Sequence, residues 1–209
     1  MGDKNYTTEQ EEFWAGEFGE DYLHRNTKEE LLAKNLWFFT DALKRVNIIK
    51  SVVEFGPNIG ANLLALRSLF PKIITAGIEI NGTAIEELKK NLPDCSVINQ
   101  SILDYQTKKK YELVLIKGVL IHQDPSVLEK VYQKLYDSCA RYILIAEYYD
   151  PNPVELDYRG NSGKLFKRDF AGEFLKKFLD FELIDYGFAY RNEKKAPQDD
   201  INWFLLEKI

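Results

Sequence analysis

Short apolar runs alternate with amphipathic segments through the middle of the chain. The apolar runs are rich in Val, Ile and Leu and predict strands over residues 51–55, 73–80, 95–99, 111–117 and 141–148. The segments between them repeat apolar residues at helical spacing and predict helices over residues 61–69, 83–91 and 125–139. Because strands that are apolar on both faces need helices on both sides, this alternation predicts a doubly wound α/β fold with a largely parallel sheet.

The N-terminal part of the chain is predicted to be helical. Helical spacing of apolar residues predicts one helix over 8–18 and a second over 28–46, the second preceded by a capping box at 27–30. No stretch rich in Pro, Gly or Ser separates these helices from the strands that follow. We therefore expect a helical cap and a sheet domain that form one structural unit, over residues 1–47 and 48–209.

The C-terminal part departs from the alternation in a different way. Residues 181–190 and 201–208 predict two strands joined by a polar loop, with no helix between them. Strands joined without a crossover helix pair antiparallel to each other. We therefore expect the sheet to have seven strands in all, mostly parallel, with an antiparallel C-terminal strand.

Composition and charge exclude several classes of protein. The chain has 209 residues, of which 45% are hydrophobic and 29% charged, which is typical of a folded soluble domain. A net charge of −5 argues against a nucleic-acid partner. The sequence has no apolar run of about 20 residues and no secretory signal, so we expect a cytoplasmic protein without a membrane partner. Cys95 and Cys139 lack the spacing of a metal knuckle or redox pair, and no metal site is predicted.

A glycine-containing loop follows the first predicted strand, and an acidic residue ends the second. The loop is Glu54-Phe55-Gly56-Pro57-Asn58-Ile59-Gly60, and the acidic residue is Glu79. Glycines let the backbone approach a ligand closely and turn into a helix. A carboxylate at the end of the second strand can accept hydrogen bonds from both hydroxyls of a ribose. The pair therefore predicts an adenosine-containing cofactor.

The loop also discriminates between adenosine cofactors. A dinucleotide site has the pattern G-x-G-x-x-G, whose helix N-terminus meets a pyrophosphate. Here Pro57 and Asn58 replace the middle glycine, and Glu54 places a carboxylate that would repel a pyrophosphate. The same carboxylate would attract the α-ammonium group of a methionine moiety. The loop therefore favours S-adenosylmethionine over NAD.

With these motifs in order, the segment from Val52 to Tyr148 resembles the class I S-adenosylmethionine-dependent methyltransferases, which have a Rossmann-like fold. The resemblance implies that the loop contacts the methionine part, that Glu79 holds the ribose, and that residues after the third strand reach the adenine. Ser101 stands where the family often has an aspartate, with Ile102 beside it. The cofactor-binding residues expected between the first and fourth strands are Glu54, Gly56, Asn58, Gly60, Glu79, Ile80, Ser101, Ile102 and Lys117.

The ends of the chain resemble a narrower group, the methylases associated with pseudaminic acid biosynthesis. The matching segments are 13–22 with Arg25-Asn26, 117–122, and 158–160 with 164–170. This resemblance implies that the N-terminal segment forms a lid over the cofactor and places Tyr22 and Arg25 near the methionine carboxylate. It also implies an acidic acceptor, a nonulosonic acid or its nucleotide conjugate. Trp14 and Phe18 fit equally well as a stripe that packs one helix against the protein.

Three residues after the fourth and fifth strands are candidates for the methyl-transfer chemistry. His122 follows the fourth strand, and with an ordinary pKa near neutrality it is a candidate general base for a hydroxyl or amine acceptor. Tyr148 and Tyr149 end the fifth strand and are candidates to orient or deprotonate that acceptor. Each of the three also fits a packing role at the end of a strand.

A basic segment after the fifth strand is the candidate acceptor-binding element. Its residues are Tyr158, Arg159, Lys164, Lys167 and Arg168. Arginine binds carboxylates and phosphates bidentately, which suits an acidic sugar or its nucleotide conjugate. A solvated basic turn is the alternative interpretation of this segment. For the chain as a whole, the alternatives are methylation of another small molecule or a protein side chain, and a non-catalytic cofactor-binding partner of a sugar pathway.

Overall fold

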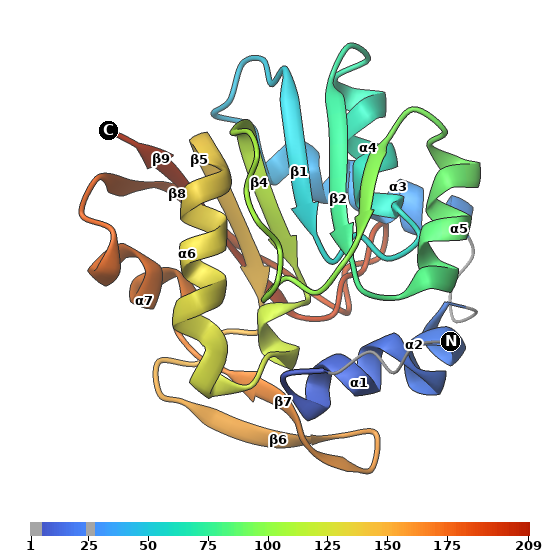
Figure 1. Cartoon of the computed structure of the whole chain (residues 1–209). Coiled ribbons are helices and arrows are strands. Elements are labelled where there is room, and N and C mark those ends of the chain that lie inside the picture. The colour runs from blue at the N-terminus through green and yellow to red at the C-terminus, as the bar shows by residue number, and fades with distance from the viewer. Residues whose placement is uncertain (1–5, 24–27) are drawn as a thin grey trace.

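A seven-stranded sheet forms the centre of the molecule (Figure 1), in a computed structural model that describes residues 6–23 and 28–209. The strand order is β3-β2-β1-β4-β5-β9-β8. Strands β3, β2, β1, β4 and β5 are parallel, and β9 runs antiparallel to both of its neighbours. The strands are β1 (Ser51–Phe55), β2 (Ile74–Glu79), β3 (Ser96–Asn99), β4 (Tyr111–Lys117), β5 (Cys139–Glu147), β8 (Phe181–Ala189) and β9 (Ile201–Lys208). The predicted α/β fold and its antiparallel C-terminal strand are confirmed.

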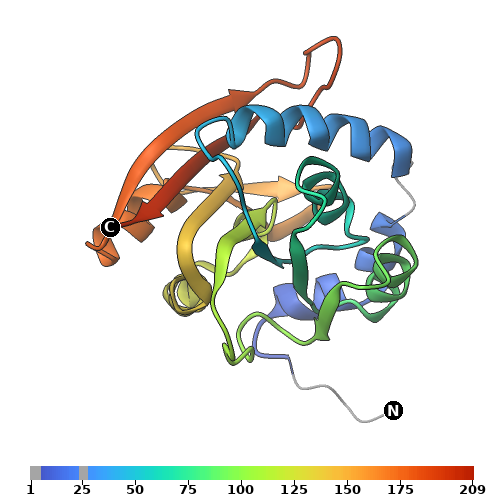
Figure 2. The ribbon, with the colours of Figure 1, turned by 90° about the horizontal axis from the view of Figure 1, so that it is seen from above.

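Helices cover both faces of the sheet, as Figures 1 and 2 show from two directions. One face packs against α3, α4 and α5, and the other against α6 and α7. The helices are α3 (Lys28–Ala42), α4 (Ala61–Leu69), α5 (Gly82–Asn91), α6 (Leu128–Ser138) and α7 (Phe170–Lys177). Side chains of β4 alternate between the two cores, with Leu113 and Leu115 on the first face and Val114 and Ile116 on the second. Two packed faces explain why these strands are apolar throughout.

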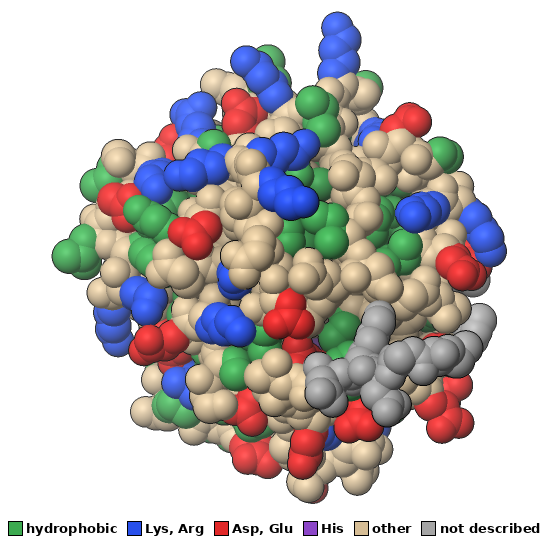
Figure 3. Space-filling view, in the orientation of Figure 1, with side chains coloured by type: hydrophobic (Ala, Val, Ile, Leu, Met, Phe, Trp, Pro, Cys, Tyr) green, Lys and Arg blue, Asp and Glu red, His purple; other side chains and the backbone are tan. Residues whose placement is uncertain are grey.

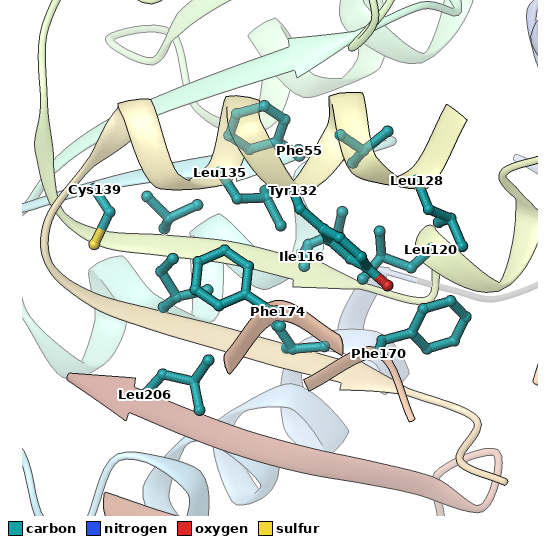
Figure 4. Packing of buried hydrophobic residues seen from close by; sticks show 14 of the residues in the cluster. Phe55, Ile116, Leu120, Leu128, Tyr132, Leu135, Cys139, Phe170, Phe174 and Leu206 are labelled. Atoms are coloured by element: carbon teal, nitrogen blue, oxygen red, sulfur yellow. The ribbon is translucent and has the colours of Figure 1, made fainter. Parts of the chain in front are cut away.

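The second core is closed by aromatic residues (Figure 4). Tyr132 of α6 and Phe174 of α7 meet edge to face, with ring centroids 6.2 Å apart. Phe174 is fully buried and also contacts Phe178 and Phe181. These contacts anchor α7 between α6 and the C-terminal strands, so the sheet keeps a rigid frame at the end opposite β3.

The N-terminal helical segment differs from the prediction. The expected single helix over 8–18 is two short helices, α1 (Glu9–Ala15) and α2 (Glu17–Tyr22), separated by Gly16 in an extended conformation. Thr8 caps α1 in a capping box with Glu11. Helix α3 ends at Ala42 rather than at Val46. The capping box predicted at 27–30 and the predicted site residue Arg25 lie outside the described residues.

A β-hairpin that the sequence did not predict follows β5. Strands β6 (Val154–Tyr158) and β7 (Asn161–Lys167) form a separate two-stranded antiparallel sheet. Both residues of the turn, Arg159 and Gly160, have positive φ, as type I′ hairpin turns require. In Figure 1 this hairpin lies beneath the carboxyl ends of the parallel strands, on the same side of the molecule as α1 and α2.

The connection between β4 and β5 begins with two 3₁₀ turns, η1 (Leu120–His122) and η2 (Pro125–Val127). The helix predicted from residue 125 therefore starts at Leu128. Asp124 precedes η2 and accepts a hydrogen bond from the backbone N–H of Ser126. This short irregular stretch turns His122 back toward the sheet edge.

Positive and negative side chains are interspersed on the surface seen in Figure 3. Among the helices in the described part of the chain, none is long and apolar enough to cross a membrane. Within the same residues, no group of His, Cys, Asp and Glu side chains is arranged to hold a metal ion.

Candidate active site

A cavity of about 430 Å³ opens at the carboxyl ends of the parallel strands. Its walls come from the segments after β1, β2, β3, β4 and β5, from α1, α2 and α3, from the turn of the β6–β7 hairpin, and from the loop between β8 and β9. The cavity therefore lies where the strand order reverses, between β1 and β4, which is where open α/β sheets bind ligands.

The glycine loop after β1 forms part of the cavity wall. Gly56 and Asn58 line the cavity and both have positive φ, +74° and +51°. A Cβ on Gly56 would lie 2.6 Å from the Val119 side chain, so only glycine fits against the loop after β4. Gly60 does not line the cavity. It begins α4 with φ +81°, and a Cβ there would lie 2.8 Å from Leu88 of α5.

Glu79 holds a fixed orientation in the cavity wall. Its Oε2 accepts a hydrogen bond from the Asn58 N–H at 2.9 Å, and its Oε1 accepts one from the Asn81 N–H at 2.9 Å. Burial raises the pKa of this carboxyl above its ordinary value, although the backbone hydrogen bonds oppose that effect. A carboxylate has about four acceptor positions, so Glu79 can still accept two hydrogen bonds, as a ribose diol requires. Ile80 lines the cavity beside it.

Glu54 does not reach the cavity itself but contacts a residue that does, Asn62. It is fully buried and does not line the cavity, but its Oε1 accepts a hydrogen bond at 2.6 Å from the Asn62 side-chain amide, and Asn62 does line it. Within the described residues, Glu54 Oε2 and Asn62 Oδ1 are buried without a hydrogen-bond partner. Burial raises the Glu54 pKa to about 8. The unpaired Asn62 oxygen in the cavity wall matches a ligand that brings N–H donors.

Lys117 lies on the same side of the cavity as Glu54 and Asn62. Its Nζ is 3.5 Å from the Asn35 side-chain oxygen of α3 and 5.2 Å from the centre of the Phe38 ring. Burial lowers the pKa of this amine, while the nearby Glu54 carboxyl raises it. Lys117 was predicted from the sequence, but Asn35 was not, because it belongs to α3, which precedes the first strand.

Ser101 and Ile102 line the cavity beyond the end of β3. The Ser101 hydroxyl accepts a hydrogen bond from the Leu103 N–H at 3.0 Å and donates one to the Glu11 carboxylate of α1. Glu11 also lines the cavity. Glu11 was not predicted from the sequence, where its signal is its place in the capping box of α1.

His122 is enclosed between two aromatic rings. The ring centroids of Trp14 and Tyr158 each lie 4.7 Å from that of His122. Its Nδ1 lies 2.6 Å from the backbone carbonyl oxygen of Lys164. Because a carbonyl only accepts, Nδ1 carries the proton in the neutral ring, and Nε2 keeps a lone pair. Burial lowers the His122 pKa to about 4, not the near-neutral value expected from the sequence, so the ring is neutral at physiological pH.

The other candidate residues divide into those that reach the cavity and those that do not. Tyr22 and Tyr148 line it. Burial raises the pKa of the Tyr148 hydroxyl, so it is protonated at neutral pH. Tyr149 points elsewhere, since it is 38% exposed and packs against Phe204 at a centroid distance of 5.9 Å.

The basic residues after β5 do not form the single cluster that the sequence indicated. Tyr158 and Arg159 line the cavity. Lys164 pairs with Glu9 at 3.3 Å, and Arg168 pairs with Glu173 at 2.8 Å, so intramolecular carboxylates neutralise both. Lys167 lies over the Tyr148 ring at 5.6 Å. Lys164 and Lys167 lie three residues apart in β7 and therefore point to opposite faces of it, while Arg159 lies in the hairpin turn and Arg168 follows the strand.

Comparisons with known proteins identify the fold. No protein-family model matches the sequence, and no curated protein matches it. The solved structure of magnesium protoporphyrin IX methyltransferase (ChlM) from Synechocystis PCC 6803 with bound SAM matches 99% of this chain and 100% of its own, with a TM-score of 0.65 and 10% identity. The glycopeptide N-methyltransferase MtfA with SAH matches 93% of this chain and 99% of its own, with a TM-score of 0.64 and 10% identity. This chain has the methyltransferase fold.

The methyltransferase fold leaves the acceptor open. Mitomycin 7-O-methyltransferase MmcR also matches 97% of this chain and 61% of its own, with a TM-score of 0.66 and 12% identity. These three neighbours are named for three different acceptors, a magnesium porphyrin, a glycopeptide and mitomycin. None of them is named for an acidic sugar, so the narrower resemblance to pseudaminic acid methylases receives no support from the fold.

Proposed function

We propose that this protein is an S-adenosylmethionine-dependent methyltransferase. The observation that carries the proposal is a row of acceptor groups across adjacent strand ends, with Asn62 after β1, Glu79 at β2 and Ser101 after β3. These groups match in order an ammonium group, a ribose diol and a base. Structures of proteins with the same fold contain SAM or SAH, which supports this assignment.

The methionine end of the cofactor fits the acceptors beside the glycine loop. The unpaired Asn62 oxygen would receive an N–H donor of the α-ammonium group, and Glu54 would hold the Asn62 side chain from behind. Lys117 would face the carboxylate. Gly56 leaves room for the ligand along the backbone, and Tyr22 would close the site from α2. Arg25 remains a further candidate for the carboxylate.

His122 is the proposed general base. S-adenosylmethionine, when bound, would supply a methyl group carried on a sulfonium sulfur. The acceptor oxygen would bond to the methyl carbon while the carbon–sulfur bond breaks and leaves a neutral thioether. The proton of the acceptor hydroxyl would pass to His122 Nε2, whose lone pair the Lys164 carbonyl keeps available. A base with a pKa of about 4 is sufficient, because the hydroxyl becomes strongly acidic as its oxygen forms the new bond. Tyr148 would orient the acceptor.

The acceptor is proposed to be small and polar with one anionic group. Arg159 is the cation that supports this, because it lies in the cavity wall next to Tyr158. A nonulosonic acid or its nucleotide conjugate has the carboxylate that Arg159 would bind. To test this, labelled methyl transfer from S-adenosylmethionine to such an acid would be compared with transfer to a neutral sugar nucleotide. We expect label in the acid only, and less label with Arg159→Ala. Equal labelling of both sugars, or none, would exclude this acceptor.

Calorimetry with S-adenosylhomocysteine tests the cofactor assignment. We expect one ligand per chain, and a loss of affinity of about 100-fold or more in Glu79→Ala, because two hydrogen bonds to a charged group are removed. Glu87→Ala is the matched control, since this exposed carboxylate on α5 bonds only to Lys90 in the described structure. Its affinity should equal that of the wild type. No binding to the wild type, or equal affinity in Glu79→Ala, would reject the proposal.

A further inference from the structure

A carboxylate from the N-terminal helix stands at the base end of the cavity. Glu11 belongs to α1, yet its Oε1 accepts the hydroxyl of Ser101, 90 residues further along the chain. Its Oε2 accepts the backbone N–H groups of Thr7 at 2.6 Å and Thr8 at 3.0 Å. The side chain is only 6% exposed, and it lines the cavity. Three donors hold this carboxylate in one orientation, and about one of its four acceptor positions is left.

The neighbouring residue on α1 supplies a second acceptor. Gln10 is 6% exposed and lines the same cavity. Its amide Nε2 donates to the Gly163 carbonyl at 2.9 Å, which fixes the side chain against β7. Its Oε1 is buried and has no hydrogen-bond partner within the described residues. A buried acceptor without a donor is costly, so its presence in a cavity wall indicates a ligand that brings N–H groups.

The position of these acceptors corresponds to one part of the cofactor. Glu79 ends β2, and Ser101 follows β3, the next strand of the sheet. If the ribose lies at Glu79, the base extends toward Ser101 and therefore toward Glu11. The exocyclic amine of adenine carries two N–H donors, and Ser101 already uses its own hydrogen on Glu11. At this end of the cavity, the Glu11 carboxylate is therefore an acceptor that comes from a helix and not from a loop after a strand.

We propose that Glu11, with Gln10 beside it, recognises the exocyclic amine of the adenine, so that the N-terminal helix sets the base selectivity of the site. This inference rests on the proposed cofactor. It makes α1 part of the binding site and not only a cover over it.

Two ligands that differ at one position of the base test the proposal. S-adenosylhomocysteine carries an amine at C6, and S-inosylhomocysteine carries a carbonyl oxygen there. A carboxylate acceptor attracts the amine and repels the carbonyl oxygen, so we expect the wild type to bind the adenosyl ligand about tenfold to hundredfold more tightly by calorimetry. In Glu11→Gln the amide can turn to donate to the carbonyl oxygen, and this preference should fall to within about threefold.

Two further variants separate recognition from helix capping. Glutamine at position 11 keeps the capping box, so a purely structural Glu11 predicts that Glu11→Gln behaves as the wild type. Thr8→Ala removes the capping hydroxyl, which accepts the Glu11 N–H at 3.3 Å, and leaves the carboxylate in place. It should weaken both ligands equally and keep their ratio. Gln10→Leu lies outside the capping box and should lower the ratio.

The outcomes distinguish this inference from the proposed function. An unchanged ligand ratio in both Glu11→Gln and Gln10→Leu would overturn the role of α1 in base recognition, and the cofactor assignment would stand on the binding of the wild type. A wild type that binds neither ligand would overturn both.

Discussion

His122 shows how burial controls the chemistry of a single side chain. The ring packs between Trp14 and Tyr158 and is only 6% exposed. Its folded pKa of about 4 lies below the ordinary value of 6.5, because burial disfavours the charged ring. The neutral ring with its proton on Nδ1 is the form that a general base needs. The same shift makes the histidine a source of acid sensitivity.

The stability of His122→Gln should therefore depend on pH differently from that of the wild type. In the wild type the unfolded chain binds a proton below pH 6.5 and the folded chain does not, so stability falls as the pH drops toward 4. From pH 7 to pH 4.5 this histidine should cost the wild type about 2–3 kcal/mol, and the variant should not lose that amount. Urea unfolding at both pH values measures the difference. Parallel losses in the two proteins would show that His122 titrates normally.

Residue types in the loops could be predicted, but their contacts could not. Glu79 and Ser101 line the cavity as their positions after β2 and β3 indicated. Glu54 lies one layer deeper than expected, because the side chain of Asn62 stands between it and the cavity. Tyr149 follows Tyr148 directly, but both lie beyond the end of β5, and Tyr149 packs against Phe204 instead of lining the cavity.

At the scale of elements, one carboxylate holds the connection that carries His122. Glu147 at the end of β5 accepts the backbone N–H groups of Val119 and Leu120, each at 2.9 Å, and that of Ile121 at 3.4 Å. Burial raises the Glu147 pKa to about 7, although these hydrogen bonds oppose the shift. The loop after β4 thus depends on the neighbouring strand for its shape.

Replacing Glu147 should destabilise the protein in proportion to the acceptors removed. Glu147→Ala leaves three backbone N–H groups without an acceptor and should cost about 4 kcal/mol or more. Glu147→Gln keeps the oxygen that serves two of them and should cost about 1–2 kcal/mol. Urea unfolding at pH 8 measures both. Equal stability of the two variants would contradict the hydrogen-bonding role.

The docking of α1 and α2 depends on a close backbone approach. The Asn81 side chain donates to the Trp14 carbonyl at 3.1 Å, and Gly19 of α2 packs against both residues. A Cβ on Gly19 would lie 2.0 Å from that carbonyl oxygen and 2.8 Å from the Asn81 amide nitrogen. The N-terminal helices therefore contact the loop that follows Glu79.

Gly19→Ala should loosen α1 and α2 without unfolding the sheet. We expect faster amide exchange over residues 9–22 and weaker binding of S-adenosylhomocysteine, because the cavity loses part of its wall. Gly82→Ala is the control, since a Cβ there meets nothing within 4 Å and Gly82 begins α5. It should leave exchange and affinity unchanged and add up to about 1 kcal/mol of stability. Normal exchange of the N-terminal helices in Gly19→Ala would refute the close packing.

The strands of the central sheet could be predicted from the sequence, including the weakly buried β3 and β8, but the β6–β7 hairpin could not. The strands β1, β4 and β9 lie within a residue or two of their predicted ranges, because their apolar runs face two helical layers or a core. The β6–β7 hairpin was missed, although Val154, Leu156 and Tyr158 alternate with acidic residues in β6, because β7 has no such alternation and most residues of both strands are at least partly exposed.

For the whole molecule, the fold follows from the alternation of strands and helices. Much of the site comes from segments that lie outside this alternation. Neighbours with only 10–12% identity share the sheet and its helices, so the apolar pattern determines the architecture. The cavity is completed by α1, α2, α3, the β6–β7 turn and the β8–β9 loop, which lie before or after the strands that form its floor. Their approach depends on tertiary contacts such as that between Glu11 and Ser101, which no local pattern encodes.

A crystal structure with S-adenosylhomocysteine would show directly which residues hold the cofactor. We expect the ribose hydroxyls within hydrogen-bonding distance of Glu79, the ammonium group at Asn62, and the adenine between Ser101 and Glu11. A ligand bound elsewhere, or a ribose that makes no contact with Glu79, would contradict this assignment.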